Sequence, residues 1–226
     1  MDYLLDDQEV ISQFRTLLEE IYRYRNGEVA DQLARMGIRY KTNMGVPVIS
    51  LKEIAKGYLP SHLLALKLWN REWRETRILA TLLEEPGKVT EQQMDFWTKS
   101  LENCELAEQL SANLWWRTPL SFVKALEWCR GKKHWIRYTG VHLAGKLARG
   151  SASSPDEMFE PFFDEFLPLS KDPALSQVLY RTLLVFAERS DYLRQMVSAW
   201  KDSISGDNPL SGAEFALEPA WETGDR

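Results

Sequence analysis

Residues 68–83, LWNREWRETRILATLL, constrain the possible fold more than any other stretch of the chain. At helical spacing the apolar residues form one stripe, and arginines and glutamates fill the remaining face. Glu72 and Glu75 are expected to pair with arginines three or four residues away. No glycine or proline interrupts the stretch, and the sequence EEPG at 84–87 ends it. The stretch either continues the helix before it or begins again at Asn70, and it needs partner helices to bury its stripe.

The rest of the chain supplies such partners. Apolar residues recur at helical spacing along most of the sequence, and we find no alternating strand of five or more residues. Thr90 and Gln93 are spaced as a capping box, and Ser50 is a candidate N-cap. The predicted helices cover residues 7–26, 28–36, 50–57, 60–69, 90–101, 103–116, 119–130, 133–149, 156–167, 174–188 and 190–204. The sequence therefore predicts an all-α protein.

The spacing of these helices indicates how they are arranged. From about residue 60 they recur as pairs roughly every 30 to 45 residues, without a strict repeat of residues. Such spacing is typical of an α-solenoid, an α-α superhelix of stacked antiparallel pairs with a concave face. An irregular helical bundle is the alternative. We expect one domain over residues 1–205 and a mobile tail over 206–226, where the periodicity stops. We also expect Trp69, Trp73, Trp115 and Trp128 to be buried between layers, because they lie on apolar stripes.

Charge is distributed unevenly along the chain. The formal net charge of -5 argues against a dedicated nucleic-acid binder, although a local patch can still bind. Between residues 130 and 149 there is no acidic residue, and Arg117 and Lys124 precede this stretch. Its basic residues are Arg130, Lys132, Lys133, Arg137, Lys146 and Arg149. They are candidates for contacts with DNA phosphates, and Arg74 and Arg77 would extend the track if they share its face. The alternative is an ordinary solvated face.

Several other classes of function have no support in the sequence. Two cysteines fit a reducing compartment better than a disulfide scaffold. The three histidines, His62, His134 and His142, do not have the spacing of a metal site, and no nucleotide-binding or hydrolase motif is present. No apolar run is long enough to span a bilayer, and the N-terminus lacks the basic region of a signal peptide. We expect a soluble, cytoplasmic monomer without a metal or cofactor.

Three segments are similar to a known family. The sequence LWNREWRE at 68–75 resembles a Leu-Trp…Arg-Glu signature of the DNA alkylation repair family, which is built from HEAT-like repeats. The preceding NMGVPVISLKEIAK, 43–56, resembles that family's segment of glycine, valine or isoleucine and proline before a helix. HWIRYTGVHLAG, 134–145, resembles its Trp-x-x-Arg helix. The resemblance covers roughly residues 10–205 and implies a HEAT-like α-solenoid that holds duplex DNA on a concave, basic face.

For active members, the resemblance also implies hydrolysis of the N-glycosidic bond of alkylated, positively charged purines. Their Trp-Asp-x-x-Asp pattern places the tryptophan at Cys104 and the last carboxylate at Glu108. Their arginine falls on Tyr138, beside Arg137, and a later aromatic falls near Arg181. A fixed carboxylate can stabilise the cationic transition state, and Tyr138 can stack on a sugar or base. The alternatives are a solvated Glu108 within an acidic helix and a packing role for Tyr138.

Two hypotheses about function follow. The first is a DNA-binding protein related to the alkylpurine glycosylases, with catalytic activity weak or lost because the aromatic and arginine positions differ. Glu108 and Tyr138 are its candidate catalytic residues, and duplex DNA, alkylated or not, is its partner. The second is a non-catalytic HEAT-like scaffold that binds DNA structures or a protein partner.

Overall fold

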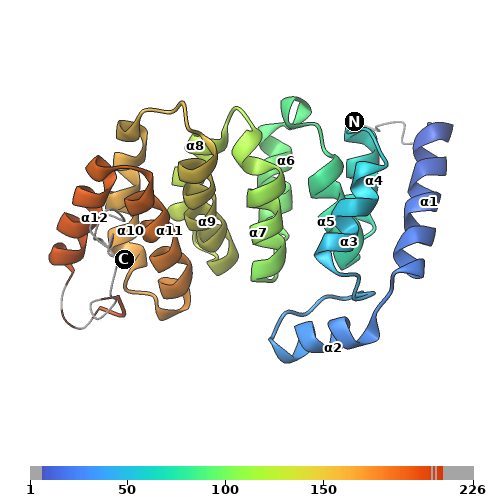
Figure 1. Cartoon of the computed structure of the whole chain (residues 1–226), viewed down its shortest axis with the longest axis horizontal. Coiled ribbons are helices and arrows are strands. Elements are labelled where there is room, and N and C mark those ends of the chain that lie inside the picture. Colours follow the sequence, from blue (N-terminus) through green and yellow to red (C-terminus); the bar gives the residue numbers. More distant parts are fainter. Residues whose placement is uncertain (1–6, 205, 207, 211–226) are drawn as a thin grey trace, which may run out of the picture. The chain divides into compact units, whose positions relative to one another are not determined.

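The computed structural model describes residues 7–204, 206 and 208–210 of the 226-residue chain. This part contains twelve α-helices and four short 3₁₀ helices (Figure 1), and its only β-pairing is an isolated bridge between Thr42 and Trp73. The α-helices are α1 (Gln8–Arg23), α2 (Gly27–Arg35), α3 (Val48–Lys56), α4 (His62–Asn70), α5 (Arg74–Leu83), α6 (Glu91–Lys99), α7 (Cys104–Asn113), α8 (Ser121–Cys129), α9 (His134–Gly150), α10 (Glu160–Leu169), α11 (Ser176–Arg189) and α12 (Asp191–Ser203). The 3₁₀ helices are η1 (Pro86–Lys88), η2 (Trp115–Arg117), η3 (Asp156–Phe159) and η4 (Pro173–Leu175).

The chain divides into two compact units, with the boundary between Leu120 and Ser121. In each unit, consecutive helices pack as pairs: α4 with α5 in the first, and α8 with α9 and α11 with α12 in the second (Figure 1). The predicted all-α architecture of helix pairs is confirmed. The expected tail lies mostly outside the described residues. Of its described part, Asn208 and Leu210 are buried, and the Asn208 Nδ2 donates to Ser170 Oγ at 2.7 Å.

The core of the first unit contains a tryptophan stack. The rings of Trp69 and Trp97 are parallel within 2° and 4.1 Å apart, and Trp115 lies 5.8 Å from Trp97. All three are at most 2% exposed. Trp73 is 8% exposed and, in the second unit, Trp128 is 3% exposed. The predicted burial of Trp69, Trp73, Trp115 and Trp128 is therefore confirmed.

The stretch 68–83 forms two helices instead of one. The end of α4 is followed by a turn in which Glu72 has a φ of 61°, and α5 begins at Arg74. The backbone N–H of Arg74 donates to the Thr42 carbonyl oxygen at 3.0 Å, so the segment before α3 fixes where α5 begins. The expected continuous helix, and its restart at Asn70, are therefore wrong.

The predicted solvent-facing side of this stretch is also wrong. Arg74 is 2% exposed and Glu75 is fully buried, because the segment between α2 and α3 covers the start of α5. The expected ion pairs differ as well. Arg74 pairs with its neighbour Glu75, and Glu72 pairs with Arg77 at 3.6 Å, five residues away.

Helix starts differ from the predictions at two further places. Helix α3 begins at Val48 after Pro47, not at Ser50, because the proline already has a φ of -55° that suits the start of a helix. Only half of the expected capping box forms at α6. The Gln93 N–H donates to Thr90 Oγ at 3.1 Å, but the Gln93 amide turns away to Glu84.

Close helix packing in the second unit depends on two glycines of α9. A Cβ at Gly140 would lie 2.6 Å from the Cys129 backbone nitrogen, so α8 and α9 touch through their main chains. A Cβ at Gly145 would lie 3.1 Å from Thr182 Oγ on α11. The remaining core of this unit is a cluster of phenylalanines, namely Phe159, Phe162, Phe163, Phe166 and Phe186.

Candidate nucleic-acid interface

Helix α9 carries a row of aromatic rings along one side. Residues three or four apart lie on the same face of a helix, which brings Trp135, Tyr138 and His142 together. The ring centroids of Trp135 and Tyr138 are 5.5 Å apart, and those of Tyr138 and His142 are 6.4 Å apart. The His134 ring lies 4.4 Å from that of Trp135. We call these four residues, all partly buried, the α9 aromatic ridge.

Two cations, Lys146 on α9 itself and Arg181 on α11, act on one end of the ridge. Thr182 Oγ donates to the Val141 carbonyl oxygen at 3.1 Å, which sets Arg181 on α11 beside His142 on α9. Burial, together with the charges of Lys146 and Arg181, lowers the pKa of His142 to about 3. Within the described part of the chain, His142 Nδ1 is buried without a hydrogen-bond partner. His142 is therefore a neutral ring at physiological pH.

Lys132 and Lys133 lie in the exposed loop that leads into α9. Neither side chain forms an ion pair with any other residue that the structure describes. The remaining arginines of the predicted basic stretch are already paired. Arg130 is 65% exposed but donates through Nε and Nη2 to Glu165 Oε1 at 2.8 and 2.6 Å. Arg137 pairs with Asp172 at 3.2 Å, whereas the two lysines are exposed and have no ion pair among the described residues.

Two basic residues that were expected on this track, Lys124 and Arg74, do not face solvent. Lys124 is 1% exposed, and its ammonium lies 2.6 Å from Glu127 Oε2 and 5.8 Å from the centre of the Trp128 ring. The expectation that it extends an exposed basic track is wrong. Arg74 is also buried, so the expectation that it lies exposed beside Arg77 is wrong. The Arg77 guanidinium packs 5.2 Å from the Trp69 ring, with its side chain only 14% exposed.

Arg74 belongs to a buried polar network in the first unit. Its Nε and Nη2 donate to the two carboxylate oxygens of Glu105 at 2.8 and 2.6 Å, and its Nη1 donates to the Val46 carbonyl oxygen. The Tyr40 hydroxyl donates to Glu105 Oε2 at 2.7 Å. Burial, followed by the charge of Glu105, strongly raises the pKa of Tyr40, so it stays a neutral donor.

The first two segments of family resemblance meet in this network. Glu75, from 68–75, accepts the N–H groups of Met44 and Val46, from 43–56, at 3.1 and 3.3 Å. A buried carboxylate needs such donors, because an unpaired buried charge is costly. The resemblance in these segments therefore reflects how the chain folds, and it carries no information about substrate.

The candidate catalytic residues lie on different units. Glu108 is partly buried on α7 of the first unit, one helical turn after Cys104. Burial raises the pKa of the Cys104 thiol, and the charge of Glu108 raises it further. Cys104 is therefore an uncharged thiol. Tyr138 is part of the ridge on α9 of the second unit.

Sequence reasoning missed one exposed basic cluster, which surrounds α2. Its members are Arg23, Arg25, Arg35, Arg39 and Lys41. The sequence does indicate this cluster, because residues 23–41 contain these five cations and only two acids, Glu28 and Asp31. The later stretch 130–149 contains six cations and no acid, which makes it the stronger signal in the sequence.

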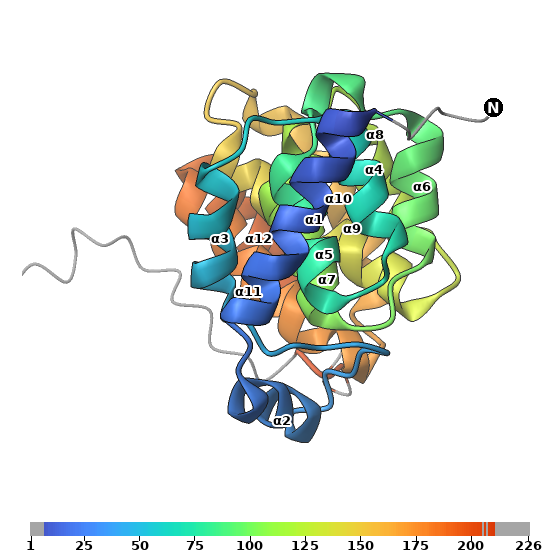
Figure 2. The same ribbon diagram turned by 90° about the vertical axis from the view of Figure 1, so that its right-hand side faces the viewer.

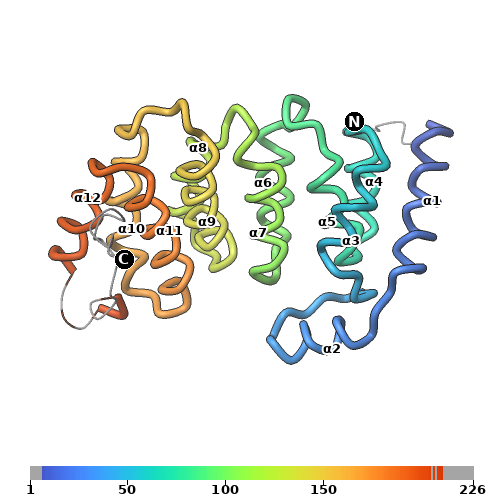
Figure 3. Tube along the Cα trace, in the orientation of Figure 1, coloured from blue at the N-terminus to red at the C-terminus, as the bar shows by residue number. Residues whose placement is uncertain are grey.

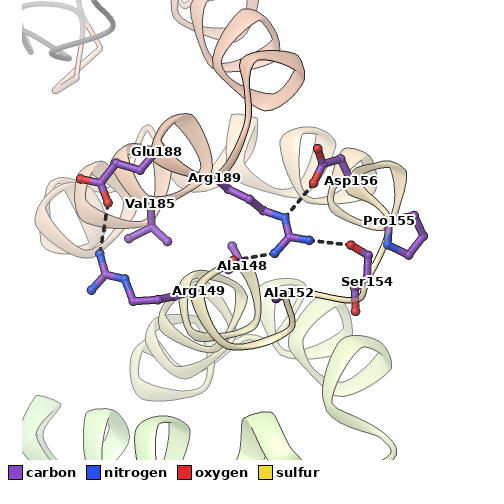
Figure 4. A pocket seen from close by; sticks show the side chains of 9 residues that line it. All are labelled: Ala148, Arg149, Ala152, Ser154, Pro155, Asp156, Val185, Glu188 and Arg189. Atoms are coloured by element: carbon purple, nitrogen blue, oxygen red, sulfur yellow. Dashed lines mark hydrogen bonds and ion pairs between the residues drawn. The ribbon is translucent and has the colours of Figure 1, made fainter. Parts of the chain in front are cut away.

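The second unit also has a pocket of about 590 Å³ between α9, α11 and the loop that joins α9 to η3 (Figure 4). Its central side chain is Arg189, which donates to the carbonyl oxygens of Ala148, Ser151 and Ser154 and to Asp156 Oδ1. Arg149 is paired with Glu188 at 3.3 Å. These bonds hold the loop in place and leave the Arg189 guanidinium no free donor pair for a ligand.

The described residues contain no group of three or more histidine, cysteine, aspartate or glutamate side chains that could hold a metal ion. Across the same residues, every helix is too short or too polar to cross a bilayer.

The fold and this interface define a class: a helical-repeat protein with exposed lysines beside a row of aromatic rings. The sequence profile of the family described as DNA alkylation repair enzyme matches residues 17–166, about two thirds of the chain. The chain belongs to that family.

A solved structure supports the fold. It is described as a member of a new family of proteins related to the HEAT-like repeat DNA glycosylases, with affinity for branched DNA structures. It superposes with a TM-score of 0.72 at 16% sequence identity, over 84% of this chain and 82% of the other. The fold is therefore of the HEAT-like repeat type. No curated protein sequence matches the chain.

Proposed function

We propose that this protein binds duplex DNA through Lys132, Lys133 and the α9 aromatic ridge. The observation that carries the proposal is the position of two exposed lysines, without an ion-pair partner among the described residues, directly before a helix that carries four adjacent rings. Lysine ammonium groups neutralise phosphates without reading sequence, and aromatic faces stack on unpaired bases or on sugars. Membership in a DNA alkylation repair family and the branched-DNA affinity described for the similar structure both support this assignment.

Arg130, Arg137 and Lys146 belong to the same proposed surface as secondary contacts. Arg130 and Arg137 would have to exchange a carboxylate partner for a phosphate, and both Glu165 and Asp172 are partly exposed. Exposed ion pairs contribute roughly 0–1 kcal/mol to stability, so Arg130, whose side chain is 65% exposed, exchanges its partner at a lower cost than the more buried Arg137. Arg77, held between Trp69 and Glu72, is a weaker candidate.

We infer that base excision is weak or lost. An excision site for cationic purines needs a positioned carboxylate, and Glu108 is the residue for that role. However, Cys104 and Tyr138 replace the tryptophan and arginine of active members, and rate depends steeply on positioning. The alternative is a scaffold that binds DNA structures, or a protein partner, without chemistry. The neutral Cys104 thiol favours this alternative, because it cannot provide the ring that would attract a cationic base.

Charge reversal tests the binding proposal. Lys132→Glu with Lys133→Glu should weaken binding to every duplex sequence alike, and the slope of log K against log salt should fall by about 0.9 for each phosphate that the protein no longer neutralises. Lys52→Glu with Lys56→Glu on α3 changes the net charge equally and serves as the control. Equally weakened binding in both double variants would show a general charge effect and overturn the assigned interface.

A base-release assay on methylated duplex DNA separates the two candidate functions. Slow release of alkylated purines by the wild-type chain would support the glycosylase-related function. Binding without release on any alkylated substrate would support the scaffold.

A further inference from the structure

Helix α2 lies apart from the other helices of the first unit in two perpendicular views (Figures 1 and 2). None of its nine residues is buried. Its C-terminal end is at the far side of the loop, from which the chain turns back toward α3 (Figure 3). We call residues 25–41 the α2 arm. A short helix without buried residues is not stabilised by a core, so its fixed position needs another cause.

Contacts at both ends of the arm provide that cause. At the entrance, the Asn26 N–H donates to the Met44 carbonyl oxygen at 2.8 Å, and the Asn26 side chain caps α2 through the N–H groups of Glu28 and Val29. Gly45 has a φ of 70° and approaches so closely that a Cβ there would lie 1.8 Å from the Asn26 carbonyl oxygen.

At the exit, the arm is held by α7. The Asn103 side chain donates to the Arg39 carbonyl oxygen at 3.2 Å, and the Tyr40 hydroxyl bonds to Asn103 and Glu105. The arm is thus ordered before any partner binds, which removes part of the entropic cost of binding.

The charge of the arm is concentrated after the helix. Residues 32–41 contain Arg35, Arg39 and Lys41 and no acid, and all three side chains are exposed. None of them forms an ion pair with another described residue. The two acids, Glu28 and Asp31, lie near the other end of α2, where a negative charge suits the helix dipole. The far end of the arm is therefore a local cationic surface on an acidic protein, which is complementary to a polyanion.

An exposed apolar side chain lies among these cations. Met36 follows α2 directly and is 67% exposed, and Gly37 after it has a φ of 80°. Proteins that bind DNA through shape insert methionine, leucine or phenylalanine between base steps and hold the flanking phosphates with arginine or lysine. Insertion costs a few kcal/mol in a continuous duplex and less where stacking is already interrupted.

We propose that the α2 arm is a second DNA contact, in which Arg35, Arg39 and Lys41 bind phosphates and Met36 enters a break in base stacking. The inference rests on the proposed function and adds a preference to it. The arm favours DNA with a nick, gap or branch over a continuous duplex, because only there is the site for Met36 already open.

The test compares a three-way junction with a linear duplex of the same length by fluorescence anisotropy. Met36→Ser should remove most of the preference for the junction and change linear-duplex affinity less than about twofold. Ile49→Ser on α3 is the matched control, since Ile49 is also 67% exposed, and it should leave the preference unchanged. Arg35→Gln with Arg39→Gln should weaken both complexes and lower the salt slope by about 1.8, the value for two phosphates.

Each contrary outcome has a separate meaning. An unchanged junction preference in the folded Met36→Ser variant overturns the wedge. If Lys132→Glu with Lys133→Glu abolishes binding while the arm variants bind normally, the arm inference fails and the proposed function stands. If the wild-type chain binds neither DNA, both fail. If the arm variants alter self-association in sedimentation and leave DNA binding unchanged, the arm contacts a second copy of the chain, which also overturns the inference.

Discussion

Arg74 and Glu105 form a two-point ion pair in the first unit, with Nε–Oε2 and Nη2–Oε1 distances of 2.8 and 2.6 Å. The pair joins the start of α5 to the first turn of α7. Through Tyr40 it also reaches the exit of the α2 arm. A residue that the sequence placed on the DNA surface thus positions other elements from inside the protein.

Replacement of Arg74 should destabilise the first unit strongly. Arg74→Met leaves the carboxylates of Glu75 and Glu105 without their cation, and loss of one partner of a buried pair costs about 3–5 kcal/mol. Urea unfolding followed by tryptophan fluorescence measures the change. Lys56→Met removes an exposed pair with Glu53 and should have little effect. A destabilisation by Arg74→Met as small as that of the control would show that the network is dispensable.

Two glycines with similar backbone conformations should respond differently to alanine. Gly45→Ala places a methyl group against the Asn26 carbonyl oxygen, so the arm must detach or the turn must distort. Gly37→Ala meets nothing within 4 Å and bears only the cost of a positive φ, about 1 kcal/mol. Hydrogen exchange of residues 26–45 should rise sharply in the first variant and little in the second. Equal protection in both would contradict the entrance contact.

His142 should make the protein less stable as the pH falls. The pKa of His142 is about 3 in the folded protein against an ordinary value of 6.5. Below pH 6.5 His142 binds a proton in the unfolded chain but not in the folded chain. The free energy of unfolding therefore decreases until the pH reaches the pKa of His142 in the folded protein. At pH 5 this amounts to about 2 kcal/mol, from 1.36 kcal/mol per pH unit. His142→Gln should therefore lose less stability than the wild type between pH 7 and pH 5. Parallel curves would show that His142 is protonated in the folded state.

Glu108→Gln tests the candidate chemistry. If the wild-type protein releases alkylated purines, the variant should not, because a neutral amide cannot stabilise the positive charge of the transition state. Duplex binding should stay the same or become slightly tighter, since one negative charge is removed. Single-turnover base release beside anisotropy measures both effects. Robust release by the variant would remove Glu108 from the mechanism.

Local patterns predicted the helices well, because the stripes that include Trp69, Trp115 and Trp128 are read directly at helical spacing. Asn103 and Ser190 cap the helices that the sequence assigned to their neighbourhoods. The break between α4 and α5 was not predictable in this way. Glu72 adopts a positive φ in the turn between the two helices, and glutamate has no local preference for that conformation.

The burial of the charged side chains of Arg74 and Lys124 was also not predictable from the sequence. Arg74 is buried because Glu105, 31 residues later, neutralises it, and no spacing rule links the two. Lys124 is hidden by packing on Trp128 and by an ion pair with Glu127. The aromatic ridge, in contrast, follows from the three- and four-residue spacing of Trp135, Tyr138 and His142 on a correctly predicted helix.

The backbone hydrogen bond between Asn26 and Met44 closes the α2 arm into a loop whose two ends meet at one point. The free energy of closing such a loop grows only slowly with its length, by about 0.6 kcal/mol for each doubling. Residues 28–38 can therefore be lengthened or shortened with little change in the stability of the helices, as long as the contacts of Arg39, Tyr40 and Thr42 with the rest of the first unit are kept. Between its two anchored ends, the arm is thus the part of the first unit whose sequence the helical core constrains least.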